Sequence, residues 1–194
     1  MIQDLDIDSP YLWEFVDDTT ASELLPKGSV SKAQNIVDRV IQWSDENRVQ
    51  LHPDKCKELR ITFPKNPSVL DPLIIDGKEI VTVDNVKLLG VTMSRDLTWN
   101  AHIEEVIKKV NKRLYFLVQL KRAKVPLKEL VLFYTTCVRS VIDYAIPAFY
   151  HALPKYLKKE LVCLEKRAIA IMNPGTHYDV ASEVLNMRLI EDHQ

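Results

Sequence analysis

The sequence predicts an α+β protein in which antiparallel strands with one packed helix precede an all-helical bundle. Residues 1–94 mix short alternating apolar segments with turn signals and one helical segment, whereas residues 98–194 follow the helical period almost throughout. A chain of 194 residues suffices for one sizeable domain or two small ones. We therefore expect two parts, 1–97 and 98–194, with the boundary near Ser94–Trp99.

The first element is a strand–turn–strand around Asp17 and Asp18. An apolar run comes before the two aspartates and a small-polar run follows them. Because Asp hydrogen-bonds its own backbone in turns, we expect the pair at the exposed end of a tight hairpin, with its apolar flanks in the core. A helix follows from Ser31, a suitable N-cap, to about Glu46, and its apolar positions form one stripe that we expect to be buried.

Further strands complete the first part. Leu59, Ile61 and Phe63 alternate with polar residues, which predicts a strand over 58–63 with these side chains on its buried face. The dipeptide Asp76-Gly77 predicts a hairpin, since a type I′ turn needs two residues that tolerate positive φ. A last strand is predicted over 87–93.

The second part is predicted to hold four helices. The first begins at Thr98 or Asn100 as N-cap and ends near Lys121. The others are expected over 127–145, 154–172 and 179–186. An apolar stripe at helical spacing marks the buried face of the first: Ile103, Val106, Ile107, Val110, Leu114, Leu117 and Val118.

Composition narrows the class of protein. Of all residues, 46% are hydrophobic and 27% charged, as in ordinary globular proteins. No run approaches 18 apolar residues and the N-terminus lacks a basic region, so we expect an intracellular protein, nuclear or cytoplasmic, neither secreted nor transmembrane. Three separated cysteines and five scattered histidines favour reduced thiols and give little support to a zinc site.

The charge is divided unevenly along the chain. Residues 1–100 hold 11 Lys and Arg against 17 Asp and Glu, a net charge of −6, whereas residues 101–194 hold 15 against 10, a net of +5. Such a division suits a metal-binding part joined to an anion-binding part. Chance, with solvated helix faces, explains it equally well.

The aspartate pair is the candidate metal site. Magnesium prefers hard oxygen ligands and is usually held by one or two carboxylates together with substrate phosphates. Asp17 and Asp18 at a hairpin tip could supply them. The alternative is an Asp-Asp dipeptide that only favours a turn.

Several short segments together resemble one family. In order along the chain, they resemble parts of the reverse transcriptase of non-LTR retrotransposons, the jockey/CR1/L2-like group of LINE elements. The segments are Met1–Leu5, Phe15-Val16-Asp17-Asp18, Trp43–Arg60 with Lys55, Lys87–Val91 and Trp99–Ala168. Two residues depart from the family pattern, since Gln3 and His52 each stand where the family has Asn. The resemblance implies a partial polymerase palm over 1–97 and a thumb-like helical region over 98–194.

The resemblance also implies a mechanism, two-metal nucleotidyl transfer with Mg²⁺ on Asp17 and Asp18, an RNA template, a DNA primer and a dNTP. Lys55 would lie near the triphosphate, unless it is a solvated loop residue. Leu89, Gly90 and Val91 would form a primer-grip-like segment, with a simple strand glycine at a bulge as the alternative. Basic residues of the helical part would contact the nucleic-acid backbone, or else form a solvated face: Lys108, Lys109, Lys112, Arg113, Lys121, Arg122, Lys124 and Lys128. The aromatic residues Tyr115, Phe116, Phe133 and Tyr134 are expected in the core.

Three interpretations stay open at this point. The family places a further metal-binding aspartate and the fingers before the hairpin, and the 16 residues that precede Asp17 hold neither. The first interpretation is therefore a reverse-transcriptase fragment without activity on its own. The second is a non-catalytic nucleic-acid-binding module that uses the basic helices. The third is a decayed gene product that exposes apolar surface and aggregates. The oligomeric state is not predicted.

Overall fold

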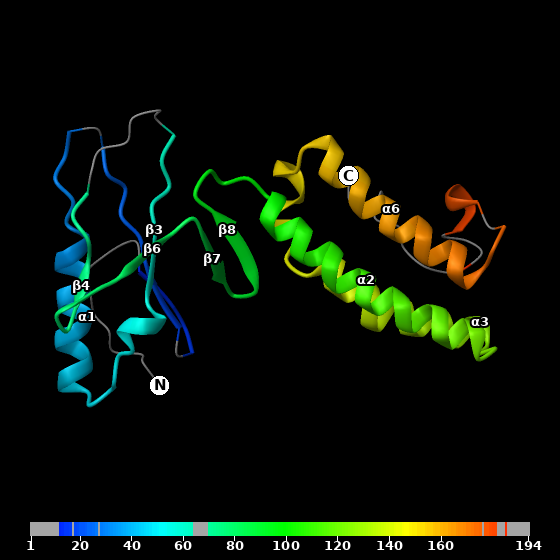
Figure 1. Ribbon diagram of the computed structural model, residues 1–194, viewed down its shortest axis with the longest axis horizontal. Helices are drawn as coiled ribbons and strands as arrows, with labels where there is room; N and C mark the ends of the chain where they lie inside the picture. Colours follow the sequence, from blue (N-terminus) through cyan, green and yellow to red (C-terminus); the bar gives the residue numbers. More distant parts are fainter. Residues whose placement is uncertain are drawn as a thin grey trace. The chain divides into compact units, whose positions relative to one another are not determined.

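Short strands and one helix make up the first unit of the chain, and long helices dominate the second. The computed structural model describes residues 12–16, 18–26, 28–63, 70–175, 177–181 and 185. It divides into two compact units, Met1–Val86 and Lys87–Gln194 (Figure 1). The division falls before the predicted boundary near Ser94–Trp99, so the strands after residue 86 belong with the helices.

The first unit contains three strand pairs and a helix. In chain order the elements are β1 (Leu12–Phe15), β2 (Asp18–Ala21), α1 (Ala33–Glu46), the 3₁₀ turn η1 (Pro53–Lys55), β3 (Lys57–Leu59), β4 (Ile74–Ile75), β5 (Lys78–Glu79) and β6 (Val81–Val83). β1 pairs with β2 and β4 with β5 in antiparallel fashion, whereas β3 lies parallel to β6.

The Asp76-Gly77 hairpin is confirmed. Ile75 pairs with Lys78, and the two turn residues have φ angles of 50° and 74°, the positive values that a type I′ turn requires. Gln34 fixes this hairpin to α1, because its side-chain amide donates to the carbonyl of Ile74 and accepts from the N–H of the same residue, each at 2.9 Å. The helix predicted from Ser31 to about Glu46 is confirmed as α1, but its N-cap prediction is wrong, because Lys32 and not Ser31 occupies the cap position.

The strand predicted over 58–63 is wrong in length and in its buried face. β3 ends at Leu59, and Ile61 and Phe63 are 39% and 78% exposed. Arg60 is instead half-buried, because its guanidinium group binds the carboxylate of Glu58 at 2.8 Å and the carbonyl oxygens of two residues further along, Leu70 and Asp71. This local polar network overrides the period-two apolar pattern.

The first unit has a small core. Among the residues described there, the buried apolar side chains are Ile75 and Ile80. The apolar stripe of α1, predicted as buried, is only half-buried, and the fully buried residue of that helix is Ser44. The helix contacts β4, a strand of two residues, which covers little of the stripe.

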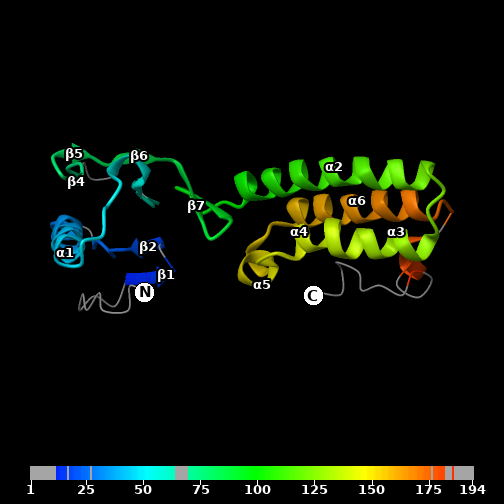
Figure 2. The same ribbon diagram turned by 90° about the horizontal axis from the view of Figure 1, so that it is seen from below.

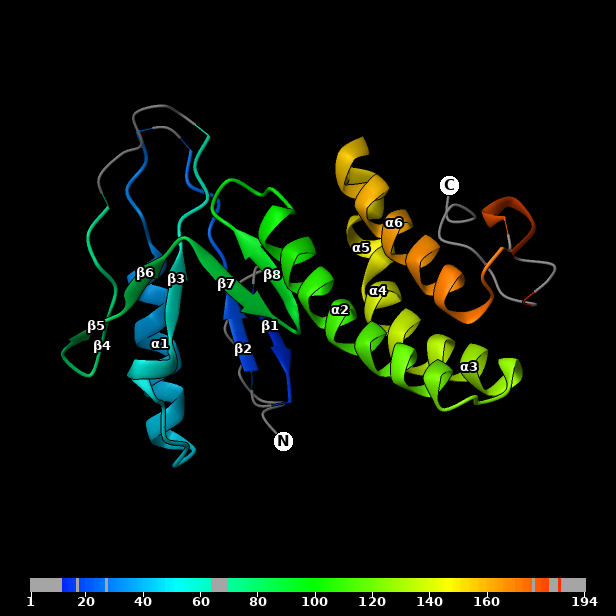
Figure 3. The same ribbon diagram turned by 45° about the vertical axis from the view of Figure 1, so that its right-hand side comes forward.

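A hairpin of β7 (Asn85–Leu88) and β8 (Val91–Ser94) is found where a single strand was predicted, and the division between the two units falls within β7. The remaining elements are α2 (Asn100–Arg122), α3 (Leu127–Phe133), the π-helical segment η2 (Tyr134–Arg139), α4 (Ser140–Asp143), α5 (Ile146–Phe149), the 3₁₀ turn η3 (Tyr150–Ala152), α6 (Lys155–Met172) and the 3₁₀ turn η4 (Tyr178–Val180). Figure 3 shows β8 beside the start of α2, a contact that holds the hairpin to the bundle.

The helices α2 and α6 begin and end close to the predicted positions. The N-cap prediction for α2 is wrong, because no side chain caps the helix and Trp99 occupies the cap position. The hydroxyl and N–H of Thr98 instead donate to the carboxylate of Asp96, at 2.9 and 3.0 Å. Most of the helix predicted over 179–186 lies outside the described residues.

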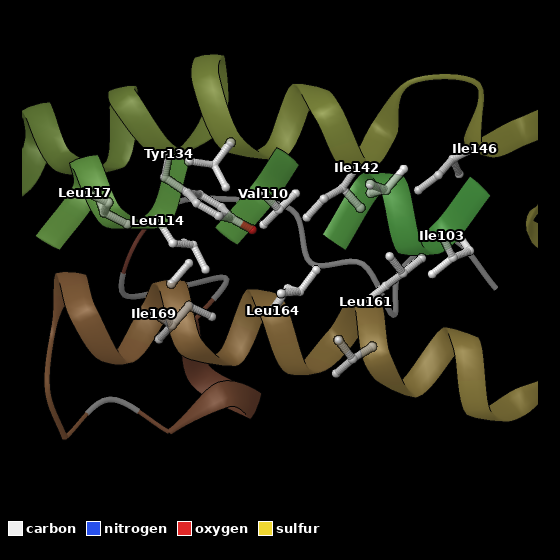
Figure 4. Packing of buried hydrophobic residues seen from close by; sticks show 14 of the residues in the cluster. Ile103, Val110, Leu114, Leu117, Tyr134, Ile142, Ile146, Leu161, Leu164 and Ile169 are labelled. Carbon is white, nitrogen blue, oxygen red and sulfur yellow. The ribbon is translucent and has the colours of Figure 1, made fainter. Parts of the chain in front are cut away.

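Three helical rods form the core of the second unit. Figure 2 shows α2, α6 and the α3–η2–α4 segment side by side, and all three pairs are in contact. The predicted stripe of α2 points inward, with Val110 and Leu117 completely buried. Figure 4 shows the side chains of the three rods meeting in one apolar layer, among them Ile103, Leu114, Tyr134, Ile142, Leu161, Leu164 and Ile169.

A charged network crosses this apolar core. Glu165 of α6 is completely buried, and its carboxylate accepts hydrogen bonds from the Arg139 guanidinium and from the hydroxyls of Tyr134 (3.2 Å) and Tyr178 (2.6 Å). Arg139 also donates to Asp143 at 2.6 Å. Burial, together with the nearby Glu165 carboxylate, raises the pKa of Tyr134, so the phenol stays protonated and donates.

One helical stretch, Leu127–Ala152, is long and apolar enough to cross a membrane by length and composition, with a mean hydropathy of 1.2. This is a weak indication, because core helices of globular proteins have the same properties. Here Leu130, Tyr134, Val138 and Ile142 of this stretch lie in the bundle core.

Candidate nucleic-acid interface

The predicted metal site lies on the β1–β2 hairpin. Phe15 pairs with Asp18, so Asp18 begins β2 and its side chain is exposed, while Asp17 lies outside the described residues. The prediction that the apolar flanks enter the core is wrong, because Trp13 and Phe15 are 54% and 59% exposed. The hairpin is only four residue pairs long, and both rings remain more than half exposed in it.

The described residues do not assemble a magnesium site. No group of three or more His, Cys, Asp or Glu side chains that could hold a metal occurs among them. Lys55, predicted beside the triphosphate, ends η1 with its side chain exposed, and its N–H donates to the carbonyl of His52 at 2.9 Å. Neighbouring Asp54 faces Lys78 at 3.4 Å across an exposed ion pair. Of the two predicted magnesium ligands, Asp18 is the one that lies in the part of the chain that the structure describes.

The predicted primer-grip-like segment is a hairpin turn. Leu89 and Gly90, with φ angles of 45° and 83°, connect β7 to β8, and Val91 begins β8. The hydroxyl of Tyr144 donates to the Leu89 carbonyl at 2.5 Å, and its ring lies so close to Gly90 that an added Cβ would meet it at 3.1 Å. Turn geometry and this close approach account for the glycine.

Three of the basic residues predicted to bind nucleic acid have partners within the bundle. The Arg113 guanidinium donates to the carbonyl of Cys137 in the π-helical segment η2. The Lys121 ammonium donates to the Met172 carbonyl at 2.8 Å, at the last residue of α6, where a cation is favourable. Lys108 faces Glu104 at 3.7 Å in an exposed i,i+4 pair, which contributes little.

The other predicted cations of α2 point into solvent. Lys109, Lys112 and Arg122 are exposed, and neither Lys112 nor Arg122 makes a hydrogen bond or ion pair with a residue that the structure describes. Between Glu105 and Glu129 the sequence has eight basic residues and no acidic one. Lys112 and Arg122 therefore have no carboxylate partner among the residues that the structure describes, unlike Lys108.

Two aromatic side chains lie among these cations. Tyr115 and Phe116 are 61% and 57% exposed, so the prediction that they belong to the core is wrong. Their rings contact each other edge to face, with centroids 5.7 Å apart and an interplanar angle of 74°. Tyr134 is completely buried and Phe133 is partly buried against the core, as expected.

These residues define a continuous surface that we call the outer face of α2. Its members are exposed and recur at helical spacing opposite the buried stripe: Lys108, Lys112, Tyr115, Phe116 and Arg122. The spacing could have revealed the aromatic pair from sequence, since residues 115 and 116 fall outside the predicted stripe.

Helix α6 borders the outer face of α2 along one edge. The Arg167 guanidinium donates to the side-chain oxygen of Asn111 at 2.8 Å, and the Tyr156 hydroxyl donates to that of Asn100 at 2.6 Å. Since these contacts lie near the two ends of α6, they fix the rotation of both helices. They also place the exposed Arg167 beside α2.

In the first turns of α2, the acidic residue Glu105 contacts the β7–β8 hairpin. Glu105 accepts from the Thr92 hydroxyl at 3.0 Å and faces Lys87 at 3.6 Å. The nearby His102 is buried, and its Nδ1 accepts from the Thr92 N–H at 3.3 Å. The carboxylates of α2 therefore lie in its first turns, away from the aromatic pair.

The arrangement as a whole is a basic helical face with exposed aromatic side chains on a three-helix core. The family model described as "Alkylated DNA repair protein alkB homolog 8, N-terminal" matches residues 99–140, which run from the start of α2 to the end of η2. The match covers less than half of the chain, but it includes all five members of the outer face of α2. No curated protein and no solved structure matches the chain.

This family match corrects the resemblance drawn from short motifs. The interpretation as a retrotransposon reverse transcriptase, with its polymerase activity and its mobile-element origin, is wrong, because the matching model describes the N-terminal region of a DNA-repair protein homologue. The assignments of palm and thumb depended on that resemblance, and no other observation supports them.

Proposed function

We propose that the helical unit binds nucleic acid, with the outer face of α2 against the sugar–phosphate backbone. The observation that carries this proposal is the charge of the stretch between Glu105 and Glu129: it has eight basic residues, six of them in α2, and no acidic residue. Phosphate groups are the natural partners of such a surface, because neutralising them releases condensed counterions.

The alternative, a solvated helix face, accounts less well for these residues. Surface helices usually intersperse both signs of charge at i,i+4 spacing, as Glu104 and Lys108 do here. Beyond Lys109, which has Glu105 one turn before it, this pattern stops, and exposed Lys112 and Arg122 have no acidic neighbour one turn away on either side. Exposed aromatic rings between the cations give such a helix no advantage in water.

The spacing of the cations fits a nucleic-acid strand. At about 1.5 Å per residue, the stretch from Lys108 to Arg122 is roughly 21 Å long. Adjacent phosphates of one strand are about 3.4 Å apart along a duplex axis, so the face spans on the order of six nucleotides. Lys112 lies about 6 Å from Lys108 along the helix, close to a two-nucleotide step.

The family match supports the same class of ligand. The printed name of the matching family refers to alkylated DNA repair, and the match falls on the helix that bears the basic face. The proposal takes from this name only the class of partner, a nucleic acid.

The test is binding of the full-length protein to labelled oligonucleotides, measured by fluorescence anisotropy. One phosphate contact contributes about 0.7–0.9 to the slope of log K against log salt, so losing it changes K about fivefold or more between 1 M and 0.1 M salt. We therefore expect Lys112→Glu to weaken binding about fivefold or more at 0.1 M salt. Lys155→Glu is the matched control, since Lys155 is an exposed lysine in the first turn of α6. Equal effects of the two substitutions would contradict the proposal.

A further inference from the structure

Resting on this proposed function, we infer that Tyr115 and Phe116 form a stacking platform for unpaired bases, so that the ligand is a single-stranded nucleic acid. The pair lies three to four residues after Lys112 and six to seven before Arg122, between two exposed cations of the same helical face. A strand whose phosphates follow these cations passes over the rings.

The two rings are arranged to receive a base. More than half of each side chain is exposed, and the interplanar angle of 74° means that one ring presents its edge to the other. In an edge-to-face pair only one ring uses its face for the mutual contact, so the other face stays open to a ligand. Base–aromatic stacking needs such an open face and tolerates any base.

The position of the pair excludes a role in the bundle core. The core stripe of α2 runs through Val110, Leu114 and Leu117, which are 2% exposed or less, on the opposite side of the helix. The rings therefore stay in water although the same helix has a well-packed apolar side. Leu132 on α3 is also exposed and has Lys128 one turn before it, but its aliphatic side chain offers no ring face on which a base could stack.

Stacking distinguishes single strands from duplexes. Bases within a duplex are already stacked on one another and offer only their edges in the grooves. A protein ring can stack on a base only where that base is unpaired, as in single-stranded DNA or RNA. Both nucleic acids share this chemistry, and parallel measurements on DNA and RNA oligonucleotides distinguish the two sources.

The experiment compares ligands that share phosphates but differ in bases. The full-length protein is titrated into a labelled single strand of about 12 nucleotides, within the range of known single-strand site sizes, into its duplex, and into an abasic strand of equal length. We expect the single strand to bind more tightly than the other two. Tyr115→Ala and Phe116→Ala should each weaken single-strand binding about fivefold or more and leave duplex and abasic binding unchanged.

Three variants complete the design. Tyr115→Phe and Phe116→Tyr keep an aromatic ring and should retain single-strand binding, whereas Leu132→Ala removes an exposed apolar side chain elsewhere in the unit and should change nothing. Circular dichroism verifies that each variant is folded. Equal affinity for single strand, duplex and abasic strand, unaffected by the alanine variants, would overturn the inference and leave the proposed function standing. Salt-independent or absent binding to every ligand would overturn both.

Discussion

Removal of the buried carboxylate of Glu165 tests how the second unit is held together. Glu165→Ala deletes the carboxylate that accepts hydrogen bonds from Arg139, Tyr134 and Tyr178, and it leaves the Arg139 guanidinium buried beside a cavity. Breaking a buried ion pair by removing one partner costs about 3–5 kcal/mol. Because Asp143 still compensates part of the Arg139 charge at 2.6 Å, we expect the lower end, about 3 kcal/mol.

The assay is urea denaturation of the full-length protein followed by far-ultraviolet circular dichroism. A loss of about 3 kcal/mol is a large share of the 5–15 kcal/mol that usually stabilises a domain, so the unfolding midpoint should fall clearly. Glu160→Ala is the matched control, because Glu160 is an exposed glutamate of the same helix and should change stability by less than about 0.5 kcal/mol.

A second variant separates charge from packing. Replacing both partners with apolar residues, as Arg139→Met with Glu165→Leu, should recover most of the lost stability, since well-packed apolar pairs often substitute for buried ion pairs. If Glu165→Ala cost less than about 1 kcal/mol, the carboxylate would not compensate Arg139 in the folded protein and the reasoning would fail.

Two further predictions concern the hairpin of the second unit and its contact with α2. Gly90→Ala should destabilise this unit by about 1 kcal/mol or more, because residue 90 has a φ of 83° and its new Cβ would press on Tyr144 at 3.1 Å. Gly77 has a φ of 74° but open space around it, so Gly77→Ala should show the cost of the backbone conformation alone. An equal loss of stability in the two variants would refute the role of Tyr144. Burial lowers the pKa of His102 despite the carboxylate of Glu105, so stability should be complete above about pH 6.5 and fall as the pH drops from there through the folded-state pKa. A His102→Gln variant that keeps the same pH dependence would rule out this histidine as the cause.

The helices of the second unit could be predicted because their sequence signals are long and repeated. The apolar stripe of α2 recurs over about four turns, and Pro154 and Asn173 mark the ends of α6. The interruption of the second predicted helix could not be foreseen, since the π-helical segment and the positive φ of Ala145 (57°) depend on tertiary packing.

The strands were harder to predict because short segments carry little information. Leu59 and Phe63 fit a buried alternating pattern, yet the partners of Arg60 determine which side chains turn inward. The Leu89-Gly90 turn escaped prediction because Leu rarely adopts a φ of 45°. The Tyr144 contact that stabilises it comes from a residue far along the chain.

The same limit explains the mistaken family resemblance. Two of its motifs, at residues 15–18 and 87–91, lie at short hairpins: Phe15 pairs with Asp18 across the first, and Leu89 and Gly90 connect β7 to β8 in the second. For the basic residues, the sequence could not separate Arg113 and Lys121, which bind backbone carbonyls, from Lys112 and Arg122, which stay exposed.

The salt dependence of single-strand binding tests the nucleic-acid interface most directly. With Lys108, Lys112 and Arg122 each neutralising one phosphate, the plot of log K against log salt should have a slope of about −2 for the full-length protein. The slope should become shallower by about 0.7 in Lys112→Glu. A slope near zero, or one that Lys112→Glu leaves unchanged, would contradict the proposal that this face of α2 contacts phosphates.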